Sequence, residues 1–534
     1  MRSLASGHVR SHPASGYCRP PMSWQDEADE IARRRRGAHA LGGAEAVAKH
    51  KSRGRGTVRE RIDALADAGS FREVGEIAGE VAEGGAFSPT NIVAGTATVG
   101  GRAAVIAGDD FTIKGGAYTP ASLKKIQHAE GLAIRRRMPL VRLLEGGGAS
   151  VSGAYGARGR SGYDLTAPSP MNLLAMQALA EVPVVCAALG PCAGFPAGRL
   201  TASHFSLMTR DTAVVLTGGP ALVERAMGKK FTKEELGGPA VHLRSGVVHN
   251  EAADEADAWR QIRAFLSYLP PSVWEPAPRL VCSDPAARAE EALLSFIPRD
   301  RRKTYKVRRL LEHVVDSGSL FEIAPLYGRT QVTALARIAG QPVGVIANDP
   351  NIYGGGMSAD GAQKLRRFVE TCDAFHLPIV SFVDEPGFLI GPDAEKAGTI
   401  RYGMEALFAV QQTRVPWIAV VLRKSFGVAQ GIHYGPSCTV LAWPSLASGA
   451  LPVESGVHLA FAKEIAAAPD PEARRRELEE EMAAAQSVFP RAEEFGVHEL
   501  IDPRETRPRL CAWVEEVQGE LRGLSGPRVY SMRP

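Results

Sequence analysis

The chain has 534 residues, of which 45% are hydrophobic and 23% are charged, and its formal net charge is +4. This length exceeds what one hydrophobic core supports and predicts two domains of roughly 200–250 residues each. The composition is that of an ordinary globular protein, and the small net charge argues against bulk nucleic-acid binding. A basic groove for a phosphorylated small molecule is still compatible with it.

The seven cysteines include no CxxC pair, and most of them lie in apolar runs that resemble strands. We interpret them as buried, reduced thiols of a cytoplasmic protein, or of a mitochondrial-matrix protein if the source is eukaryotic. We expect neither a disulfide framework nor a metal site. No apolar run reaches the ~18 residues that a membrane-spanning helix needs, so we expect no membrane association.

The N-terminal stretch 1–25 contains no acidic residue but includes Arg2, Arg10 and Arg19. This composition is compatible with an organellar transit peptide, but we favour a disordered tail, with Met22 as an alternative start. Residues 1–44 are therefore predicted to be a disordered or helical extension.

An internal repeat is the strongest feature of the sequence. The residues DAGSFRE at 67–73 recur as DSGSLFE at 316–322, and each motif follows a stretch with a helical pattern. Farther along, matching residues are 239 positions apart (378 − 139) without insertion or deletion, and later the separation is 233 (416 − 183). The matched pairs are Gly101 and Gly340, Gly115 and Gly354, Lys125 and Lys364, Pro139 and Pro378, Gly148 and Gly387, Pro183 and Pro416, and Gly194 and Gly427. We predict a tandem duplication.

Each repeat alternates buried strands with helices. In both repeats an apolar run predicts a strand. After this strand come a glycine-rich loop, a helix (about 120–136 and 359–375) and a second strand that follows a proline. This alternation predicts an α/β fold with a mostly parallel sheet. Ligands of such folds bind at the carboxyl ends of strands, where these glycine loops cluster.

The duplication also sets the predicted domain boundaries. Residues 45–268 form the N-terminal domain and 305–525 the C-terminal domain, and the proline-rich stretch 269–304 is the linker between them. Residues 470–488 predict a charged helix, which we interpret as a solvated surface.

Several long motifs resemble one known family, the carboxyltransferase (β) subunits of propionyl-, acetyl- and methylcrotonyl-CoA carboxylases. They are 59–71 (RERIDALADAGSF), 231–238 (FTKEELGG), 265–271 (FLSYLPP), 372–375 (CDAF) and 383–389 (VDEPGFL). The resemblance extends from about residue 45 to 520.

The resemblance implies two crotonase-like domains of ββα-superhelix fold. It also implies an active site between the N-terminal half of one subunit and the C-terminal half of another, in a hexamer built as a trimer of dimers. Biotin, carried as carboxybiotin by a partner carrier protein, would donate the carboxyl group, and a CoA thioester would accept it. A biotin carboxylase would be a further partner, because the chain contains neither an MKM biotinylation motif nor an ATP-grasp signature.

Carboxyl transfer to an acyl-CoA develops negative charge on the biotin ureido oxygen and on the thioester oxygen. Backbone N–H groups at strand-to-helix turns stabilise such charges without a side chain. The family's paired oxyanion residues match Gly194 and Phe195 in the first repeat and Val428 and Ala429 in the second. Phe195 and Val428 replace glycines of the family, which adds side chains and disfavours a positive φ.

The glycine loops supply the predicted cofactor-binding residues, which are Gly147, Gly148, Ala149, Gly354 and Gly355, together with Gly431. The family's arginine in the first loop is replaced by Ser150, and its late MGPEGA motif reads LPVESG at 451–456. We expect altered substrate preference from these departures. Gly431 matches a family residue that influences acyl size, which suggests a roomier pocket.

Other polar residues are weaker candidates. Lys51, Arg53, Arg55 and Lys114 are candidates for contacts with the CoA phosphates, although each is compatible with an ordinary surface cation. His433 and His458 are candidates for proton transfer, but we favour structural roles for both.

Three alternatives stay open at this point. The first is a biotin-dependent acyl-CoA decarboxylase subunit, which runs the transfer backwards. The second is a hydratase or isomerase of the crotonase type, which the tandem duplication argues against. The third is a non-catalytic scaffold subunit of a carboxylase complex, which the lost glycines favour.

Overall fold

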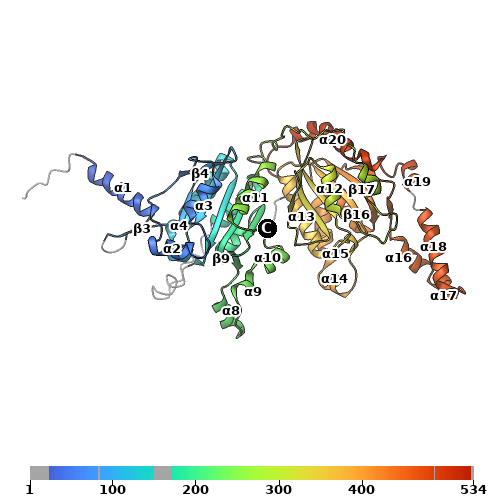
Figure 1. Cartoon of the computed structure of the whole chain (residues 1–534), viewed down its shortest axis with the longest axis horizontal. Helices are drawn as coiled ribbons and strands as arrows, with labels where there is room; N and C mark the ends of the chain where they lie inside the picture. Colours follow the sequence, from blue (N-terminus) through green and yellow to red (C-terminus); the bar gives the residue numbers. More distant parts are fainter. Residues whose placement is uncertain (1–22, 82–84, 150–169, 486–487, 531–534) are drawn as a thin grey trace, which may run out of the picture.

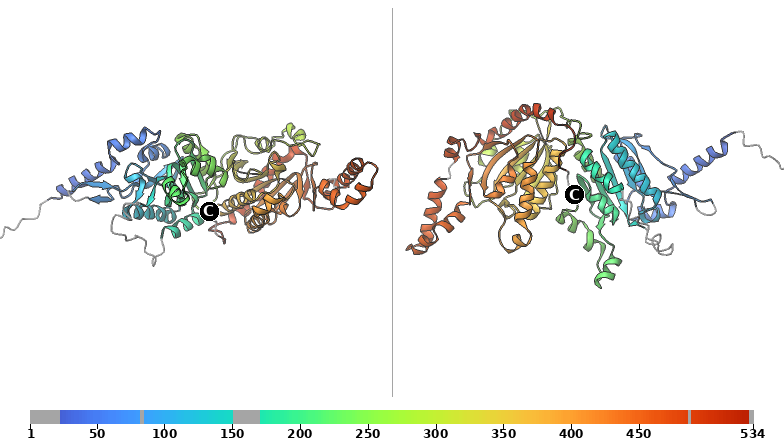
Figure 2. Two further views of the ribbon diagram at one scale, coloured as in Figure 1. Left: turned by 90° about the horizontal axis from the view of Figure 1, so that it is seen from below. Right: turned by 180° about the vertical axis from the view of Figure 1, so that it is seen from behind.

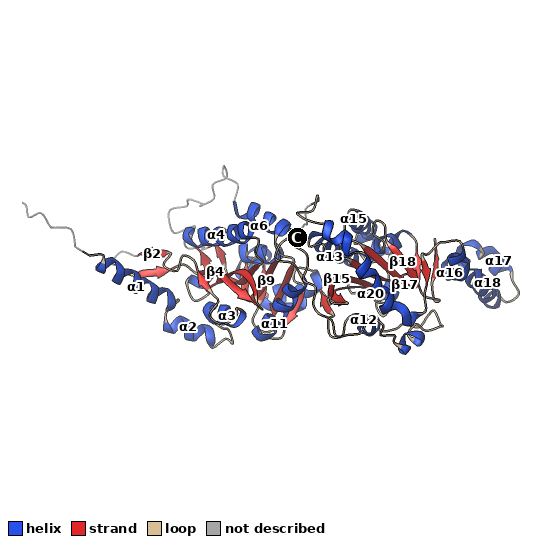
Figure 3. Ribbon diagram, turned by 90° about the horizontal axis from the view of Figure 1, so that it is seen from above, coloured by secondary structure: helices blue, strands red, loops and turns tan. Residues whose placement is uncertain are grey.

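The structure is a computed structural model and describes residues 23–81, 85–149, 170–485 and 488–530. Figure 1 shows two halves side by side along the long axis of the molecule, the N-terminal half in blue to green and the C-terminal half in yellow to red. Each half is built around one eight-stranded sheet. Figure 3 shows both sheets, in red, with helices packed around them.

The N-terminal sheet has the strand order β1-β4-β5-β7-β9-β10-β12, and β11 also pairs with β9. The pairings of β4 with β1 and β5 are antiparallel, and all the others are parallel. The strands are β1 (Arg72–Glu73), β4 (Ile92–Val99), β5 (Arg102–Asp109), β7 (Leu140–Gly146), β9 (Val184–Ala193), β10 (Phe205–Thr209), β11 (Val214–Leu216) and β12 (Asn250–Ala252).

The C-terminal sheet has the order β13-β14-β15-β16-β17-β18-β20, and β19 pairs with β17. Here too only the pairings of β14 are antiparallel. The strands are β13 (Phe321–Ile323), β14 (Gln331–Ile338), β15 (Gln341–Asn348), β16 (Ile379–Glu385), β17 (Trp417–Phe426), β18 (Thr439–Ala442), β19 (Ala447–Gly449) and β20 (Glu499–Leu500).

The two sheets are copies of one another. The starts of β14, β15 and β16 are offset from those of β4, β5 and β7 by the same 239 (331 − 92, 341 − 102, 379 − 140), and the start of β17 is offset from that of β9 by 233 (417 − 184). Because strand order, strand direction and sequence offset all agree, the predicted tandem duplication and the mostly parallel sheets are confirmed.

The main helix of each half is capped in the same way. α4 (Pro120–Arg136) begins after Thr119, whose hydroxyl oxygen accepts the N–H of Ser122, and α13 (Ala359–Ala374) begins after Ser358, whose hydroxyl accepts the N–H of Gly361. Such caps satisfy an N–H that the first helical turn leaves without a partner. The predicted helices at 120–136 and 359–375 are confirmed to within one residue.

Shorter elements complete both halves. In the N-terminal half they are α1 (Gln25–His39), α2 (Ala44–Lys51), α3 (Val58–Leu65), β2 (Gly79–Val81), β3 (Phe87–Pro89), η1 (Lys114–Gly116), β6 (Ala117–Tyr118), β8 (Gly148–Ala149), α6 (Pro170–Glu181), α7 (Phe195–Thr201), α8 (Pro220–Met227), α9 (Lys233–Gly237), α10 (Pro239–Ser245) and α11 (Glu255–Tyr268). From residue 291 onwards they are η2 (Glu291–Ser295), α12 (Val307–Val314), η3 (Tyr353–Gly355), α14 (Pro392–Lys396), α15 (Thr399–Gln411), η4 (Val428–His433), α16 (Val453–Ala460), α17 (Ala462–Ala467), α18 (Pro471–Ala485), α19 (Val488–Glu493), η5 (Pro503–Glu505), α20 (Thr506–Glu516) and α21 (Gln518–Gly523).

Three groups of helices project from the body (Figure 2): α1 at one end, α16 to α18 at the other, and α8 with α9 from the N-terminal half. α18 (Pro471–Ala485) is the helix that the charged stretch 470–488 predicts. No helix within the described residues is long and apolar enough to cross a membrane.

An aromatic cluster joins the two halves. Phe205 of β10 is fully buried, stacks on Phe265 of α11 with ring centroids 4.9 Å apart, and meets Phe321 of β13 edge-on at 5.5 Å. Nearby, the Tyr268 hydroxyl donates to the carbonyl of Ser319, and Arg337 donates to the carbonyl of Ser267. The halves therefore share one continuous apolar core across their boundary.

Replacing Phe205 by alanine removes the ring that touches both halves. We expect Phe205→Ala to lower the free energy of unfolding by about 3–5 kcal/mol, because it leaves a cavity in a packed core. The control is Phe495→Ala, since Phe495 is 74% exposed. Denaturant unfolding, followed by tryptophan fluorescence, measures both. Equal midpoints for the two variants would show that the cluster does not hold the halves together.

Candidate active site

The two predicted oxyanion turns occupy equivalent places in the two halves. Gly194 follows β9 with φ 65° and ψ −120°, and Gly427 follows β17 with φ 63° and ψ −163°. Residues other than glycine rarely adopt this backbone region. A helix begins at the next residue in both cases, Phe195 for α7 and Val428 for η4. Both turns therefore reverse the chain at the carboxyl end of a central strand.

The amides of these two glycines hold the turns in place. The Gly194 N–H donates to the carbonyl of Leu216 in β11 at 3.1 Å, and the Gly427 N–H donates to the carbonyl of Gly449 in β19 at the same distance. An N–H that is bonded to a strand carbonyl is not available to a ligand. This bond argues against the prediction of Gly194 as an oxyanion donor and leaves Phe195 as the candidate donor of the first turn.

The N–H groups of Phe195, Val428 and Ala429 lie at the starts of helices, where no intrahelical acceptor exists. In contrast to the expectation from sequence, the replaced glycines cause no backbone strain. None of the described residues with positive φ is Phe195 or Val428, because Gly194 and Gly427 take that conformation instead. The turns are unequal, however: Pro196 follows Phe195 and has no N–H, so the first turn offers one amide and the second offers two.

The predicted residues Gly147, Gly148 and Ala149 lie beside the first turn. β8 (Gly148–Ala149) pairs with β6 (Ala117–Tyr118), and the Gly147 N–H donates to the carbonyl of Gly115 at 3.2 Å. A Cβ on Gly148 would lie 2.8 Å from the carbonyl oxygen of Ala193 and 3.5 Å from the nitrogen of Phe195. The glycine loop thus passes directly over the amide of Phe195. Ser150, where the family's arginine is lost, lies outside the described residues.

The predicted glycines of the second half have different environments. Gly354 lines a pocket of about 240 Å³ together with Lys424, Phe426 and Ala447, at the end of β17 next to the second turn. Gly355 is buried, and its carbonyl accepts a hydrogen bond from the Asn348 side chain. It therefore fixes the conformation of the loop at 353–355. Gly431 lies in η4, where a Cβ would come within 3.0 Å of the Leu407 side chain.

A buried carboxylate lies at the carboxyl end of the third strand of each sheet, counted from β4 or β14. Glu145 is fully buried and binds Arg61 at 2.6 Å and Arg55 at 2.9 Å. Asp384, its counterpart at an offset of 239 (384 − 145), binds Arg423 at 2.9 Å and accepts the Tyr305 hydroxyl at 3.0 Å. Buried charges need such partners, so these carboxylates are structural anchors of the strand ends.

Several predicted candidates for the CoA phosphates already have partners. Arg55 is bound to Glu145 and largely buried, so it is not available to a phosphate. Lys51 pairs with Glu60 and Lys114 with Glu80, both at the surface, where such pairs are weak and exchangeable. Arg53 is exposed.

The two candidate histidines differ. His433 is fully buried and binds Glu385 at 3.2 Å and Ser381 at 3.3 Å, which agrees with the structural role that we favour. His458 is exposed on α16.

A buried polar network behind the first turn was missed by the sequence interpretation. Arg199 of α7 lies 3.6 Å from Asp109 and 3.6 Å from Glu130, and Glu130 pairs with Arg142 at 3.0 Å. Burial raises the pKa of Tyr118, so its hydroxyl keeps the proton that it donates to Asp109. This network fixes α7 and hence Phe195. The one available signal was Arg142 inside an otherwise apolar strand.

No group of three or more metal-ligating side chains is found among the described residues. The chemistry that the geometry itself supports is stabilisation of developing negative charge by backbone amides at two equivalent turns.

Comparisons with known proteins agree with this picture. A family model described as a carboxyl transferase domain matches residues 49–518. The carboxyltransferase subunit of propionyl-CoA carboxylase from Haloferax mediterranei is 32% identical and aligns over 92% of this chain and 96% of its own length. The α subunit of methylmalonyl-CoA decarboxylase from Veillonella parvula is also 32% identical, over 88% of this chain and 92% of its own. The crystal structure of transcarboxylase 12S superposes with a TM-score of 0.86 at 30% identity and covers 97% of this chain and 99% of its own.

The fold defines a duplicated enzyme of crotonase-like architecture, with equivalent turns at the carboxyl ends of two central strands. The chain belongs to the carboxyl transferase family, as a carboxyltransferase subunit that transfers a carboxyl group to an acyl-CoA.

The close approach of Gly148 to Phe195 gives a direct test of the first turn. We expect Gly148→Ala to lower kcat for carboxyl transfer to an acyl-CoA by about 10²-fold or more, because Gly148 has φ 78° and the new Cβ would lie 2.8 Å from the Ala193 carbonyl oxygen, so that the chain beside the Phe195 amide must shift. Gly519→Ala is the control, since Gly519 is exposed in α21, outside the site, and its Cβ would meet nothing within 4 Å. If both variants keep wild-type kcat, the amide of Phe195 has no catalytic role.

Proposed function

We propose that the chain transfers the carboxyl group of carboxybiotin, carried by a partner biotin carrier protein, to the α-carbon of a short-chain acyl-CoA through a thioester enolate. One observation carries the proposal: two equivalent strand ends each present helix-start amides next to a positive-φ glycine. Two oxyanions form in this reaction, and each of the two turns would stabilise one of them with preorganised N–H donors.

The two turns offer different numbers of N–H donors, and we assign a different oxyanion to each. The amide of Phe195, beneath the glycine loop at 147–149, faces the thioester oxygen of the acyl-CoA, and stabilising that oxygen acidifies the α-carbon. The amides of Val428 and Ala429 hold the ureido oxygen of biotin. Glycines at 147, 148 and 354 let the ligands approach the backbone closely. Gly355 acts only through the shape of its loop.

The pocket beside the second turn fits a compact bicyclic ring. Its apolar walls are Phe426, Ala447, Pro452 and Val453. Its polar side is formed by Lys424 together with Arg301, Arg302, Lys303, Arg423 and Glu454. Burial lowers the pKa of Lys424, which favours the neutral form of its amine. A neutral amine costs less free energy to cover with the uncharged ring of biotin than a charged one does. Carboxybiotin, when bound there, supplies the carboxyl group.

The site requires a second copy of the chain. Neither turn lines the cavity between the halves, the pocket at the end of β17 or three further pockets in the described part of the chain. Around the second turn, Tyr353, Ile390, Phe408 and Val428 are all more than half exposed, and Val428 itself is 59% exposed. Exposed apolar groups of this kind mark interaction surfaces. Transcarboxylase 12S assembles as a hexamer in its crystal structure, and we propose a hexamer here too, a trimer of dimers, with a biotin carboxylase as a further partner.

The direction of transfer distinguishes the alternatives. The decarboxylase α subunit from Veillonella parvula is as similar to this chain as the carboxylase subunit is. We favour carboxylation, working in the cytoplasm or, in a eukaryote, in the mitochondrial matrix. The scaffold alternative loses its main support, since the replaced glycines cost no backbone strain.

The proposal is tested by isolating the tagged chain with its partners and probing for a biotinylated protein with streptavidin. The complex is then assayed for ATP- and bicarbonate-dependent carboxylation of acetyl-, propionyl- and butyryl-CoA. We expect a biotinylated partner and carboxylation of at least one substrate. Absence of both would contradict the assignment, and ATP-independent release of carbon dioxide from a carboxylated acyl-CoA would favour the decarboxylase.

The size of the acyl pocket is a separate prediction. We expect the wild-type protein to accept acyl chains longer than acetyl, because Gly431 has no side chain. Gly431→Ile should lower kcat/KM for propionyl-CoA relative to acetyl-CoA by about 10-fold or more, a typical effect of one methylene in an apolar pocket. Gly523→Ala is the control, since Gly523 is exposed in α21, away from the site, and its Cβ would meet nothing within 4 Å. Strict preference of the wild type for acetyl-CoA would contradict this role.

A further inference from the structure

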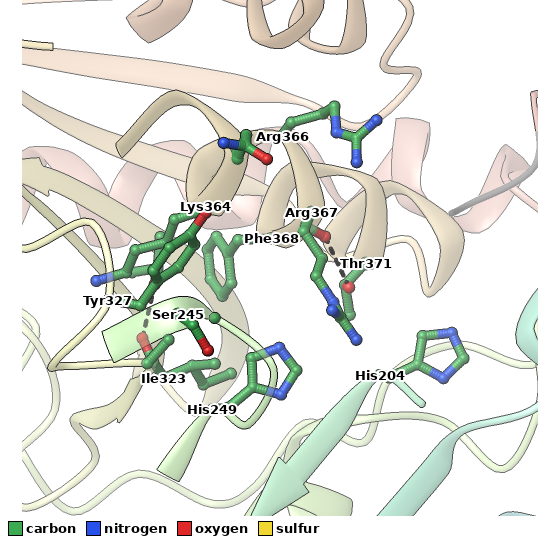
Figure 4. Close-up of a pocket in the computed structure, with 14 residues that line it drawn as sticks. His204, Ser245, His249, Ile323, Tyr327, Lys364, Arg366, Arg367, Phe368 and Thr371 are labelled. Carbon is green, nitrogen blue, oxygen red and sulfur yellow. Dashed lines mark hydrogen bonds between the residues drawn. The ribbon is translucent and has the colours of Figure 1, made fainter. Parts of the chain in front are cut away.

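A cavity of about 160 Å³ lies between the two halves of one chain, and it contains neither oxyanion turn. His204, just before β10, and the residues from the end of α10 to the start of β12 contribute one wall, and α13 with the residues around β13 contributes the other. In the close-up of Figure 4, Arg367 reaches from α13 toward His204 and His249, whereas Arg366 points the other way. The lining residues include Lys364, Arg366 and Arg367 but no aspartate or glutamate.

Lys364 differs from its counterpart in the first repeat. That counterpart is Lys125, at the same offset of 239 (364 − 125), and it pairs with Glu73 at 3.0 Å. The corresponding Glu322 is held by both Nε and Nη2 of Arg308, and Lys364 donates instead to the carbonyl of Gln331 at 2.8 Å. Lys364 is only 5% exposed, and burial lowers its pKa to about 7. In the second repeat the Lys364 amine is therefore buried without an ion pair to a carboxylate.

Arg367 is a second buried cation in the same wall. Its Nη2 donates to the carbonyls of Thr201 and Ser203 in the N-terminal half, but its buried Nε has no acceptor among the described residues. Burial lowers the pKa of this guanidinium to about 10. A buried cation with an unused donor costs free energy, unless an anion accepts from it.

His249 adds a neutral donor. Its Nδ1 accepts the N–H of Ser206 at 2.9 Å, so the ring proton is on Nε2, for which no partner is found in the described part of the chain. Burial holds the pKa of His249 well below its usual range, and that of His204 at about 3, so neither ring is charged near neutral pH. His204 is already satisfied at both nitrogens by Val184 and Leu179.

We propose that this cavity is a binding site for a small oxyanion with two negative charges, such as a phosphate or a short dicarboxylate, held by Arg367 and the Nε2–H of His249. The Lys364 amine lies on the other side of the cavity from these two groups (Figure 4) and favours the ion through its charge. The volume suits a compact anion and excludes a nucleotide. A ligand here links the two halves of one subunit, remote from both turns, so the site is independent of the proposed carboxyl transfer. Binding stabilises the association of the halves by mass action.

The lysine gives the site a distinctive signature. Glu322 and Asp349 lie near Lys364, but both carboxylates are bound to Arg308, so they compensate its burial only in part. An anion close to the amine favours the charged form and raises its pKa. At pH 7.5 the free lysine is partly deprotonated, and binding should therefore take up a proton. The shifted pKa values of Arg367, the two histidines and Tyr327 all lie away from this pH.

The test is calorimetric titration of the full-length assembled protein with inorganic phosphate at pH 7.5, repeated in buffers of different ionisation enthalpy, with malonate as a second probe. We expect one saturable site per chain, net proton uptake and a rise in the melting temperature. Preference for phosphate or malonate identifies the class of anion. Lys364→Met should weaken binding about tenfold or more and abolish proton uptake. Lys125→Met is the matched control and should bind as the wild type does.

Arg367→Met is a second variant, and size-exclusion chromatography confirms that each variant assembles. Binding that survives in both Lys364→Met and Arg367→Met would overturn the proposal, as would the absence of binding to the wild type. Loss of phosphate binding in Lys424→Met instead would place the ion in the pocket at the end of β17 and would also overturn it. Carboxyltransferase activity is not a readout, so failure here leaves the proposed function unaffected.

Discussion

The catalytic geometry depends on one hydrogen bond that occurs twice. In each half, a glycine with positive φ ends a central strand and donates its N–H to a short neighbouring strand, Gly194 to Leu216 and Gly427 to Gly449. This bond uses the N–H of the glycine itself. It also fixes the direction of the N–H of the next residue, which is the first residue of a helix. A side chain at the next residue is therefore tolerated, which explains how Phe195 and Val428 occupy the positions after the two glycines without a positive φ.

Duplication made two such turns, and divergence then separated their roles. Strand-end carboxylates are kept in both halves as Glu145 and Asp384, each neutralised by arginine, because an unpaired charge there would unfold the strand end. Pro196 removes one donor from the first turn, whereas the second turn keeps two. The same divergence gave Lys125 a carboxylate partner, whereas Lys364 donates to a backbone carbonyl. The charge of Lys364, which lies between the halves, is therefore only partly balanced by carboxylates.

Much of the fold follows from the sequence, because an offset of 239, and later of 233, relates the central strands of the two halves. The offset also locates both turns, but it does not reveal which N–H groups are already bonded, and so Gly194 was included among the donors. Arg55 was a candidate for phosphate binding because a charge in a glycine-rich stretch usually lies at the surface. Its burial depends on Glu145, far away in the sequence, and on a tertiary contact that no local pattern encodes. The Asp109–Arg199–Glu130 network was missed for the same reason.

The central claim is that the first turn of one subunit and the second turn of another form each active site. It is tested most directly by co-expressing two inactive variants, Gly148→Ala in the first half and Gly427→Ala in the second, and measuring carboxylation by the mixed assemblies. Because each mixed dimer contains one site with both turns intact, we predict that activity absent from either variant alone returns in the mixture. Mixed assemblies that form but stay inactive would contradict a site shared between subunits.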